Sequence, residues 1–415
     1  MSPLRYIPLS YNHADSQASA LRLVLSLNPD WEGPGNQIEF VRFTDGITNT
    51  LLKIINRKPG LTEEQIDSEA VLMRAYGNHT EILIDRERET RSHALLAQRG
   101  LAPPLLARFK NGLLYRFIRG HVTSPRDLVQ PAVWRAVARR LGQWHAVLPV
   151  DVSSASAPSE ETPAVASRLQ LLDSNKKGSV QPDDITPIQP REAGPNLWTV
   201  LQKWILALPV TTEEQRARRR TLQKELERIV AELDDGAGIG ERGLVFAHCD
   251  LLSANVVVLP RGTKSESNDT EEVHFIDYEY ATPSPAAFDI ANHFAEWGGY
   301  DCDYNMLPTR SVRRQFLTEY VKSYSRHGGS LGGKSEEEVV NKLFDDVDRF
   351  RGIPGFYWGV WALIQATISQ IDFDYASYAE VRLGEYWAWR RELDGSRARA
   401  GDEMPLRERR WAQEA

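Results

Sequence analysis

The spacing of apolar positions changes after about residue 120, and the change predicts two kinds of structure. Before that point, short runs have the character of strands: residues 38–55 alternate like a hairpin, residues 70–77 are rich in apolar residues, and residues 105–120 carry the hairpin turn Asn111-Gly112. Strands are predicted over residues 38–55, 70–77 and 105–120. Farther on, apolar residues recur at three- and four-residue intervals, and helices are predicted over residues 131–148, 212–233, 288–299, 336–350 and 354–370. The pattern predicts an α+β fold with a small β-rich N-terminal lobe and a larger, mostly helical C-terminal lobe.

Three polar segments lie between or after these elements. Residues 63–67 are acidic and are interpreted as a loop or linker. Residues 151–196 are rich in Ser, Ala, Pro and Asp, so a flexible insert is expected there. Residues 396–415 form a charged tail that is expected to end as an exposed helix. The N-terminal lobe is therefore assigned to residues 1–120 and the C-terminal lobe to residues 121–395.

A polar loop between two short apolar runs carries the candidate chemistry. It follows Val245–Ala247 and holds His248, Asp250 and Asn255, and Asp277 ends a further β-type run. An Asp, an Asn five residues later and a second Asp beyond a hairpin have the spacing of kinase catalytic loops. One carboxylate would accept the proton of a substrate hydroxyl, while the amide oxygen and the second carboxylate would hold Mg²⁺. The alternative is an ordinary hairpin with polar turn residues, and the presence of His248 and Asp277 argues against it.

Two features of the N-terminal lobe suit nucleotide binding. The loop FTDGITNT contains the turn pair Asp45-Gly46 among small polar residues, and its backbone N–H groups could lie over phosphates. Arg74 stands in the middle of a predicted strand, where a cation is costly unless it is paired or faces a ligand. Glu89, on a helix predicted over residues 86–99, could pair with it in place of the Lys–Glu ion pair of kinases. A simple turn and a surface ion pair are the alternatives.

Composition narrows the class of protein. The chain has 415 residues, 41% of them hydrophobic and 26% charged, which suits a soluble globular protein with ample core. A net charge of −7 argues against a surface for nucleic acid or anionic membrane. No apolar stretch is long enough to span a bilayer, and the N-terminus lacks the pattern of a signal peptide. Two cysteines give neither a disulfide framework nor a zinc site, so the cytoplasm is the expected location.

Several stretches resemble the choline/ethanolamine kinase family: AHCDLLSANVV, FIDYEYATPSPAAFDIANHFAEW and WGVWALIQATIS. The similarity runs from about Phe43 to Trp387. It implies a bilobal, protein-kinase-like fold and the Mg²⁺-dependent transfer of the γ-phosphate of ATP to an amino alcohol. FTDGITNTLL and VLMRAYGNHTEILIDRERE resemble the ethanolamine kinase branch most. This implies formation of phosphoethanolamine from ethanolamine, the first step of phosphatidylethanolamine synthesis.

The resemblance assigns roles residue by residue. Asp250 matches the catalytic Asp, and Asn255 and Asp277 match the magnesium ligands. The nucleotide is expected to contact Thr44, Gly46, Thr48, Asn49, Arg74 and Glu89. The amino alcohol is expected to contact Tyr280, Glu296, Trp358, Trp361 and Tyr378. A cationic head group needs a carboxylate and aromatic faces, and the last set supplies both. Considered alone, Trp358 and Trp361 would be interpreted as packed aromatic core. The resemblance replaces this interpretation with a role in the amino-alcohol site.

The chain departs from the family pattern beside the expected machinery. The family usually has Asn where this chain has Cys249, and often Gly where it has Ala254. Activity is expected to survive both changes. The Tyr that follows the Glu-Trp pair in choline kinases is shifted here to Tyr300. This shift leaves the choice of amine open.

Three other functions stay open beside ethanolamine kinase. One is a choline kinase or a kinase of dual specificity. Another is a kinase of the aminoglycoside-phosphotransferase type, which would share Asp250 and Asn255 but not the aromatic set. The third is a pseudokinase scaffold, and the intact Asp250, Asn255 and Asp277 argue against it. No nucleic-acid partner is expected, and a homodimer is allowed.

Overall fold

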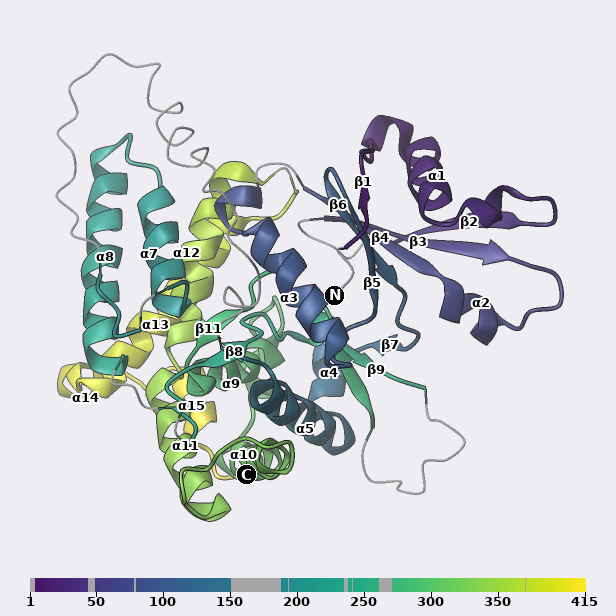
Figure 1. Cartoon of the computed structure of the whole chain (residues 1–415). Coiled ribbons are helices and arrows are strands. Elements are labelled where there is room, and N and C mark those ends of the chain that lie inside the picture. The colour runs from purple at the N-terminus through teal and green to yellow at the C-terminus, as the bar shows by residue number, and fades with distance from the viewer. Residues whose placement is uncertain are drawn as a thin grey trace.

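The computed structural model describes residues 4–43, 49–77, 80–150, 188–192, 194–234, 238–240, 242–260, 271–369 and 371–415. Residues 151–187 and 193 of the predicted insert lie outside the described residues. A strand-rich lobe lies against a larger lobe made mostly of helices (Figure 1). This is the α+β arrangement predicted from the sequence. The exact division at residue 120 stays a prediction.

The N-terminal lobe is built on a six-stranded sheet with the strand order β1-β5-β6-β4-β3-β2. Its strands are β1 (Tyr6–Ile7), β2 (Gln37–Phe43), β3 (Asn49–Arg57), β4 (Val71–Tyr76), β5 (Leu105–Phe109) and β6 (Gly112–Arg116). Its helices are α1 (Ser16–Leu27), α2 (Glu63–Glu69) and α3 (Arg86–Gln98). Met73 and Ala75 share a buried cluster with Leu23 and Val24 of α1. Because side chains alternate along a strand, Arg74 points to the opposite face of the sheet.

Helix α2 occupies a segment that was expected to be a loop or linker, and that prediction is wrong. Thr62 accepts the backbone N–H of Gln65, and the Gln65 side chain accepts the backbone N–H of Thr62. This capping box satisfies N–H groups that the first turn would otherwise leave unpaired. The acidic residues then fall in the first turn, where the helix dipole favours negative charge.

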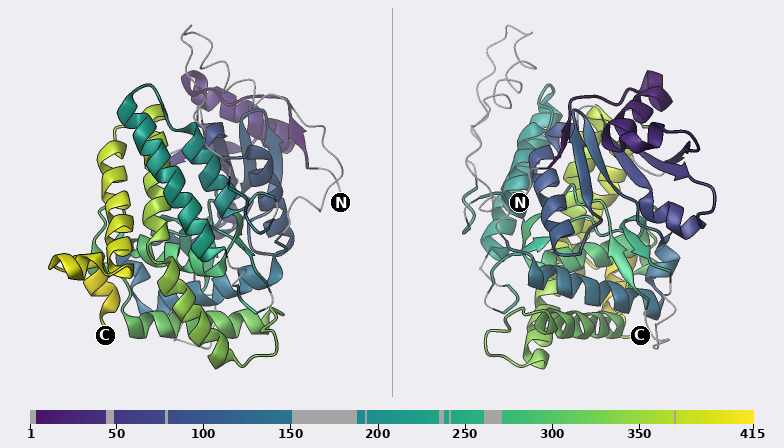
Figure 2. Two further views of the ribbon diagram at one scale, coloured as in Figure 1. Left: turned by 90° about the vertical axis from the view of Figure 1, so that its left-hand side faces the viewer. Right: turned by 45° about the vertical axis from the view of Figure 1, so that its right-hand side comes forward.

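Helices make up most of the C-terminal lobe (Figure 2). They are α4 (Pro125–Leu128), α5 (Pro131–Val147), α7 (Leu197–Ala207), α8 (Glu213–Leu233), α9 (Ala286–Ala295), α10 (Arg310–Arg326), α11 (Glu336–Phe350), α12 (Ile353–Ile368), α13 (Tyr375–Leu393), α14 (Ser396–Ala400) and α15 (Leu406–Ala412). The periodic apolar residues of α5 are buried in the main core, as predicted. None of the helices within the described residues combines the length and apolar character needed to span a membrane.

Two glycines allow helices of this lobe to approach closely. A Cβ atom on Gly142 of α5 would lie 2.4 Å from the carbonyl oxygen of Tyr320 in α10. A Cβ atom on Gly355 of α12 would lie 2.6 Å from the carbonyl oxygen of Arg382 in α13. Both distances are far below van der Waals contact, so the two helix pairs require glycine at these positions.

Short strands flank the candidate catalytic loop. They are β7 (His121–Val122), β8 (Val245–Ala247), β9 (Val256–Val258), β10 (Val273–Phe275) and β11 (Thr282–Ser284). Strand β8 pairs with β11, whereas β9 pairs with β10 and β7. The runs on either side of the loop therefore belong to different sheets, which excludes the simple hairpin. The loop joins the two sheets.

The charged C-terminal tail does not end as an exposed helix, and this expectation is wrong. Arg407, Glu408 and Trp411 of α15 are buried. The Nε1 of Trp411 donates to Oδ1 of Asp348 at 2.7 Å, and the Arg313 guanidinium lies 3.9 Å from the centre of the Trp411 ring. The sequence did not predict this burial because the buried face of α15 is itself largely charged.

Candidate active site

One buried carboxylate holds the loop that follows β8. Asp289 of α9 accepts the backbone N–H groups of His248 (2.9 Å) and Cys249 (2.8 Å) and the Nε2 of His145 (3.0 Å). Burial opposes ionisation of Asp289, but the hydrogen bond from His145 keeps its pKa below the usual value. The chain bends at Cys249, whose φ of 63° lies in the left-handed region. Asn adopts this region more readily than most residues, which gives a physical reason for the Asn that the family usually has there.

His248 links this loop to the segment that carries Asp277. Its Nε2 lies 3.0 Å from the carbonyl oxygen of Ile276, and its Nδ1 lies 3.3 Å from the backbone N of Asp250. Burial lowers the pKa of His248 to about 4, so the ring is neutral near pH 7. A neutral ring has one donor and one acceptor, so Nε2 donates to Ile276 and Nδ1 accepts from Asp250. His248 is therefore a positioning residue rather than a base.

Asp250 and Asn255 contact each other within the loop. The Nδ2 of Asn255 donates to the carbonyl oxygen of Asp250 at 2.7 Å and to its Oδ2 at 3.2 Å. Burial raises the pKa of Asp250 well above its usual value, and the charges of Asp277, Glu296 and Glu279 add to the effect. A cation would relieve this concentration of acidic groups. The site therefore favours a bound metal ion, a cationic substrate, or both.

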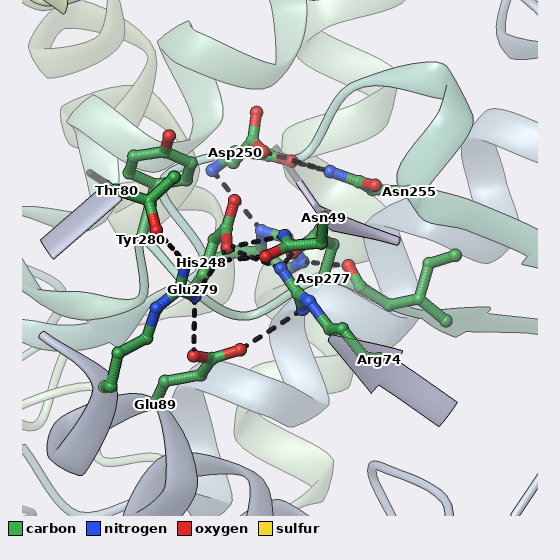
Figure 3. Close-up of polar contacts among 12 residues, drawn as sticks. Asn49, Arg74, Thr80, Glu89, His248, Asp250, Asn255, Asp277, Glu279 and Tyr280 are labelled. Carbon is green, nitrogen blue, oxygen red and sulfur yellow. Dashed lines mark hydrogen bonds and ion pairs between the residues drawn. The ribbon is translucent and has the colours of Figure 1, made fainter. Parts of the chain in front are cut away.

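Arg74 brings three carboxylates together (Figure 3). Its Nη1 lies 3.3 Å from Oε1 of Glu89, and its Nη2 lies 2.7 Å from Oδ1 of Asp277 and 2.5 Å from Oε2 of Glu279. Burial opposes the charge on Arg74, but the Asp277, Glu279 and Glu89 carboxylates hold its pKa well above the usual value. The predicted Arg74–Glu89 pair is present, and it is buried rather than on the surface.

A second arginine, which the sequence did not single out, joins this cluster. The Nη1 of Arg86 lies 2.9 Å from Oε2 of Glu89 and 3.1 Å from Oε2 of Glu279. Asn49 also donates its Nδ2 to Oε2 of Glu279 at 3.1 Å. Of the four residues of this loop that are expected to contact the nucleotide, Asn49 lies within the described part of the chain, whereas Thr44, Gly46 and Thr48 lie outside it.

The donors that could hold a metal ion are an amide and a carboxylate. The backbone carbonyl oxygen of Asn255 accepts the backbone N–H of Ile276 at 3.0 Å. This bond brings Asn255 beside the start of the Asp277 turn. Asp277 has a φ of 64°, and burial raises its pKa to about 6 although Arg74 acts in the opposite direction. Among the described residues, no three His, Cys, Asp or Glu side chains form a metal cluster. This donor set fits Mg²⁺, which usually takes one or two protein carboxylates and completes its shell with phosphate oxygens and water.

The expected amino-alcohol residues form a buried aromatic group. Trp358 and Trp361 of α12 have ring centroids 5.5 Å apart and are each 6% exposed. The Nε1 of Trp361 donates to the hydroxyl of Tyr280 at 2.8 Å, and the Nε1 of Trp358 donates to Oδ1 of Asn292 at 2.9 Å. Asn292 in turn donates to the carbonyl oxygen of Cys249 at 3.0 Å. The aromatic group is therefore joined to the candidate catalytic loop, and it is also part of the main core.

Glu296, the expected partner of the substrate cation, already has a cationic neighbour. Its Oε1 accepts from Nη2 of Arg382 in α13 at 3.0 Å. Burial raises the pKa of Glu296, and Arg382 opposes the rise. The hydroxyl of Tyr378 lies 3.4 Å from Nη1 of the same arginine. Tyr300 is 48% exposed. This residue, whose shifted position leaves the choice of amine open, therefore lies at the surface.

The residues that the sequence did not identify have a common character. They are Arg86, Glu279, Asp289 and Arg382. Glu279, Asp289 and Arg382 are buried charges and Arg86 is a partly buried one, and each has a partner from a distant part of the chain. The DYEY stretch offered the clearest clue, because a second acidic residue follows Asp277 by two positions. The other three occur within helices, where nothing in the local pattern indicates which tertiary partner a charged residue meets.

Comparisons with known proteins find similar sequences over most of the chain. The model of the choline/ethanolamine kinase family matches residues 40–387. Ethanolamine kinase 1 of Mus musculus is 32% identical over 384 residues, covering 90% of this chain and 89% of its own. A probable ethanolamine kinase of Nematostella vectensis is 32% identical over 374 residues, covering 90% of this chain and 93% of its own.

Solved structures resemble the chain over most of its length. An ethanolamine kinase from Plasmodium vivax has a TM-score of 0.62 at 23% identity, covering 90% of this chain and 89% of that chain. A choline kinase from Cryptosporidium parvum has a TM-score of 0.61 at 20% identity, covering 92% of this chain and 97% of that chain. The bilobal, protein-kinase-like fold expected from the sequence is confirmed.

Proposed function

Because the chain belongs to the choline/ethanolamine kinase family, we propose that it transfers the γ-phosphoryl group of ATP to ethanolamine and forms phosphoethanolamine and ADP. The observation that carries the proposal is the convergence of Asp250, Asn255 and Asp277 on one loop junction. The relatives named as ethanolamine kinases support the choice of ethanolamine.

Asp250 acts as the base in the proposed mechanism. The substrate oxygen attacks the γ-phosphorus, the hydroxyl proton passes to the Asp250 carboxylate, and the bond from the γ-phosphorus to the β–γ bridging oxygen breaks. Asn255 fixes the Asp250 side chain through Oδ2, and His248 fixes its backbone. General-base catalysis of this type contributes roughly 10²–10⁴-fold to the rate.

Asn255 and Asp277 are proposed to hold Mg²⁺, which would neutralise charge on the phosphates. Arg74 positions Asp277 through the 2.7 Å contact and, with Glu89, fixes α3 against β4. The nucleotide is proposed to lie between the lobes, with its phosphates near the segment from Thr44 to Asn49. Asn49 supports this placement because its side chain reaches Glu279 beside the Asp277 turn.

The substrate ammonium is proposed to bind between Glu296 and the aromatic group of Tyr280, Trp358, Trp361 and Tyr378. The pair with Arg382 uses Oε1 of Glu296, and a carboxylate has a second oxygen that can accept from an N–H donor. A primary ammonium offers three such donors, whereas a quaternary ammonium offers none and depends on aromatic faces. Ethanolamine can therefore use both kinds of partner.

A panel of substrates tests the assignment. Initial rates of ADP formation would be measured with ethanolamine, its mono- and dimethyl derivatives, choline and an aminoglycoside, each with ATP and Mg²⁺. The proposal expects kcat/KM to be highest for ethanolamine and to fall with methylation. A maximum at choline would assign a choline kinase, a maximum at the aminoglycoside would assign the antibiotic-kinase class, and no turnover of any alcohol would assign a pseudokinase.

Location in the cytoplasm and assembly as a homodimer belong to the same proposal. The two free cysteines support a reducing compartment. Light scattering coupled to size-exclusion chromatography would give the mass of the purified protein. A mass near 94 kDa, about twice the 47.0 kDa of the chain, would establish the dimer.

A further inference from the structure

Helix α15 lies beyond the residues matched to the family model, yet it packs firmly into the C-terminal lobe (Figure 1). The Trp411 ring lies 6.3 Å from that of Phe294 in α9, the helix that leads to Glu296. After α15, the carbonyl oxygens of Gln413 and Glu414 accept the first backbone N–H groups of α10. These N–H groups have no partner within their own helix. The segment from α15 to Glu414 is thus packed as part of the lobe.

A row of alternating charges leads from α15 to Glu296. The Nε of Arg407 lies 3.9 Å from Oε2 of Glu385, and the same oxygen lies 3.4 Å from Nε of Arg382. The Nη2 of Arg382 then lies 3.0 Å from Oε1 of Glu296. Each of these four residues is 6% exposed or less. We call Arg407, Glu385, Arg382 and Glu296 the charge relay.

The outer end of the charge relay is anchored to a third element. Arg407 donates its Nη2 to the carbonyl oxygen of Arg351 at 2.5 Å and its Nη1 to Oε1 of Glu408 at 3.1 Å. The other oxygen of Glu408 lies 3.0 Å from Nε of Arg351, between α11 and α12. Arg407 is therefore held by a hydrogen bond to a backbone carbonyl as well as by ion pairs.

We propose that α15 is a positioning element for the amino-alcohol site, in which Arg407 acts through Glu385 and Arg382 to hold the Glu296 carboxylate in place. This inference rests on the proposed function, because it concerns the site for the substrate ammonium. Arg407 touches neither substrate nor nucleotide in this assignment. Its contribution is to the binding of the amino alcohol and not to phosphoryl transfer.

The physical reason is the competition of two carboxylates for one arginine. Arg382 lies between Glu296 and Glu385, and buried charges are stable only when each is compensated. Arg407 compensates Glu385 from the far side, which leaves Arg382 available to Glu296. Without Arg407, Glu385 would draw Arg382 toward itself and weaken the charge-assisted hydrogen bond on Oε1 of Glu296. The carboxylate would then be less well placed for the ammonium.

A comparison of kinetic constants separates this role from simple stabilisation of the fold. Arg407→Ala is compared with Arg409→Ala, which lies on the same helix but is paired on the surface with Glu403 at 2.7 Å. The proposal expects Arg407→Ala to raise KM for ethanolamine roughly three- to tenfold, with KM for ATP and kcat within about twofold of wild type. Arg407→Lys should restore part of the loss, and Arg409→Ala should match wild type. Thermal unfolding fixes an assay temperature at which each variant is folded.

A double-mutant cycle tests the path through Glu385. If Arg407 acts through Glu385, then Glu385→Gln removes the carboxylate that competes for Arg382, so the double variant Arg407→Ala/Glu385→Gln should have a lower KM for ethanolamine than Arg407→Ala. A double variant whose KM is as high as that of Arg407→Ala, or higher, would overturn the relay. In Arg407→Ala itself, an unchanged KM for ethanolamine or an equal rise in KM for ATP would do the same. If Arg407→Ala does not fold, Arg407→Lys carries the test, alone and combined with Glu385→Gln. Inactive wild-type protein overturns the proposed function and this inference together, whereas active wild type with any of the contrary results overturns the relay alone.

Discussion

The Nη2 of Arg74 lies 2.7 Å from Oδ1 of Asp277, so a cation of the N-terminal lobe contacts a carboxylate of the C-terminal lobe. The two residues are 203 positions apart. The same guanidinium contacts Glu89 within its own lobe and Glu279 beside Asp277. Arg74, which was predicted to pair with Glu89 inside one lobe, therefore also joins the two lobes at the site.

Replacement of Arg74 should destabilise the protein and abolish its activity. Arg74→Ala takes a cation away from Glu89 and Glu279, which stay buried beside Arg86, and breaking such a buried group is expected to lower the free energy of unfolding by about 3–5 kcal/mol. Urea denaturation measures the effect. Arg57→Ala, which removes surface contacts to Glu39 and Glu63, is the control and should change little. Equal stability of the two variants would refute the role given to Arg74.

Loss of Asp277 should appear in the dependence on metal. Asp277→Asn removes the charge of a proposed Mg²⁺ ligand, so the Mg²⁺ concentration for half-maximal rate should rise roughly tenfold or more. Asp301→Asn, an exposed acidic residue of the same lobe, serves as the control. Superimposable Mg²⁺ titrations of Asp277→Asn and wild type would show that the metal is held elsewhere.

The fold was predictable where its cause is local. The apolar run of β4 and the helical repeat of α5 follow from burial, and both elements were predicted within two residues of their observed bounds. Helix α2 was missed because its acidic sequence suggested a loop, although Thr62 and Gln65 encode its start. Helix α15 was expected to be exposed because a charged face normally is. Its burial depends on Arg351 and Glu385, which the local sequence does not bring to it.

The candidate site was predictable in its motif residues but not in their partners. Asp250, Asn255 and Asp277 lie together because backbone spacing around two short strands brings them to one junction. Asp289 and Arg382 depend on tertiary packing, in which a charge on one helix meets a partner from a distant segment. Such partners have no spacing rule along the sequence.

The choice of amine should depend differently on Glu296 and Trp361. Glu296→Gln weakens an acceptor that only a primary ammonium can fully use, so kcat/KM should fall more for ethanolamine than for choline. Trp361→Ala removes an aromatic face, which should reduce kcat/KM for choline at least as much as for ethanolamine. Both constants would be measured for each variant. Equal losses for the two alcohols in Glu296→Gln would contradict the role of this carboxylate.

Buried histidines should make the fold sensitive to acid. Burial lowers the pKa of His93 to about 4, and its Nε2 contacts the carbonyl oxygen of Pro103 at 3.0 Å. Between the unfolded pKa of about 6.5 and about 4, the unfolded state binds a proton that the folded state does not, so stability falls as the pH falls. The free energy of unfolding should therefore drop between about pH 7.5 and about pH 5. In His93→Gln this drop should be smaller than in wild type by about 1–2 kcal/mol. An unchanged loss would mean that His93 is protonated in the folded protein.

Phosphorus NMR of the reaction products, recorded for wild type and Asp250→Asn, examines both the proposed reaction and its base. With ATP, Mg²⁺ and ethanolamine, wild-type protein should produce the resonance of phosphoethanolamine together with ADP. Asp250→Asn should form this product roughly 10²–10⁴-fold more slowly while still binding ATP. No phosphoethanolamine from folded wild-type protein, or a rate for Asp250→Asn within about tenfold of wild type, would contradict the assignment.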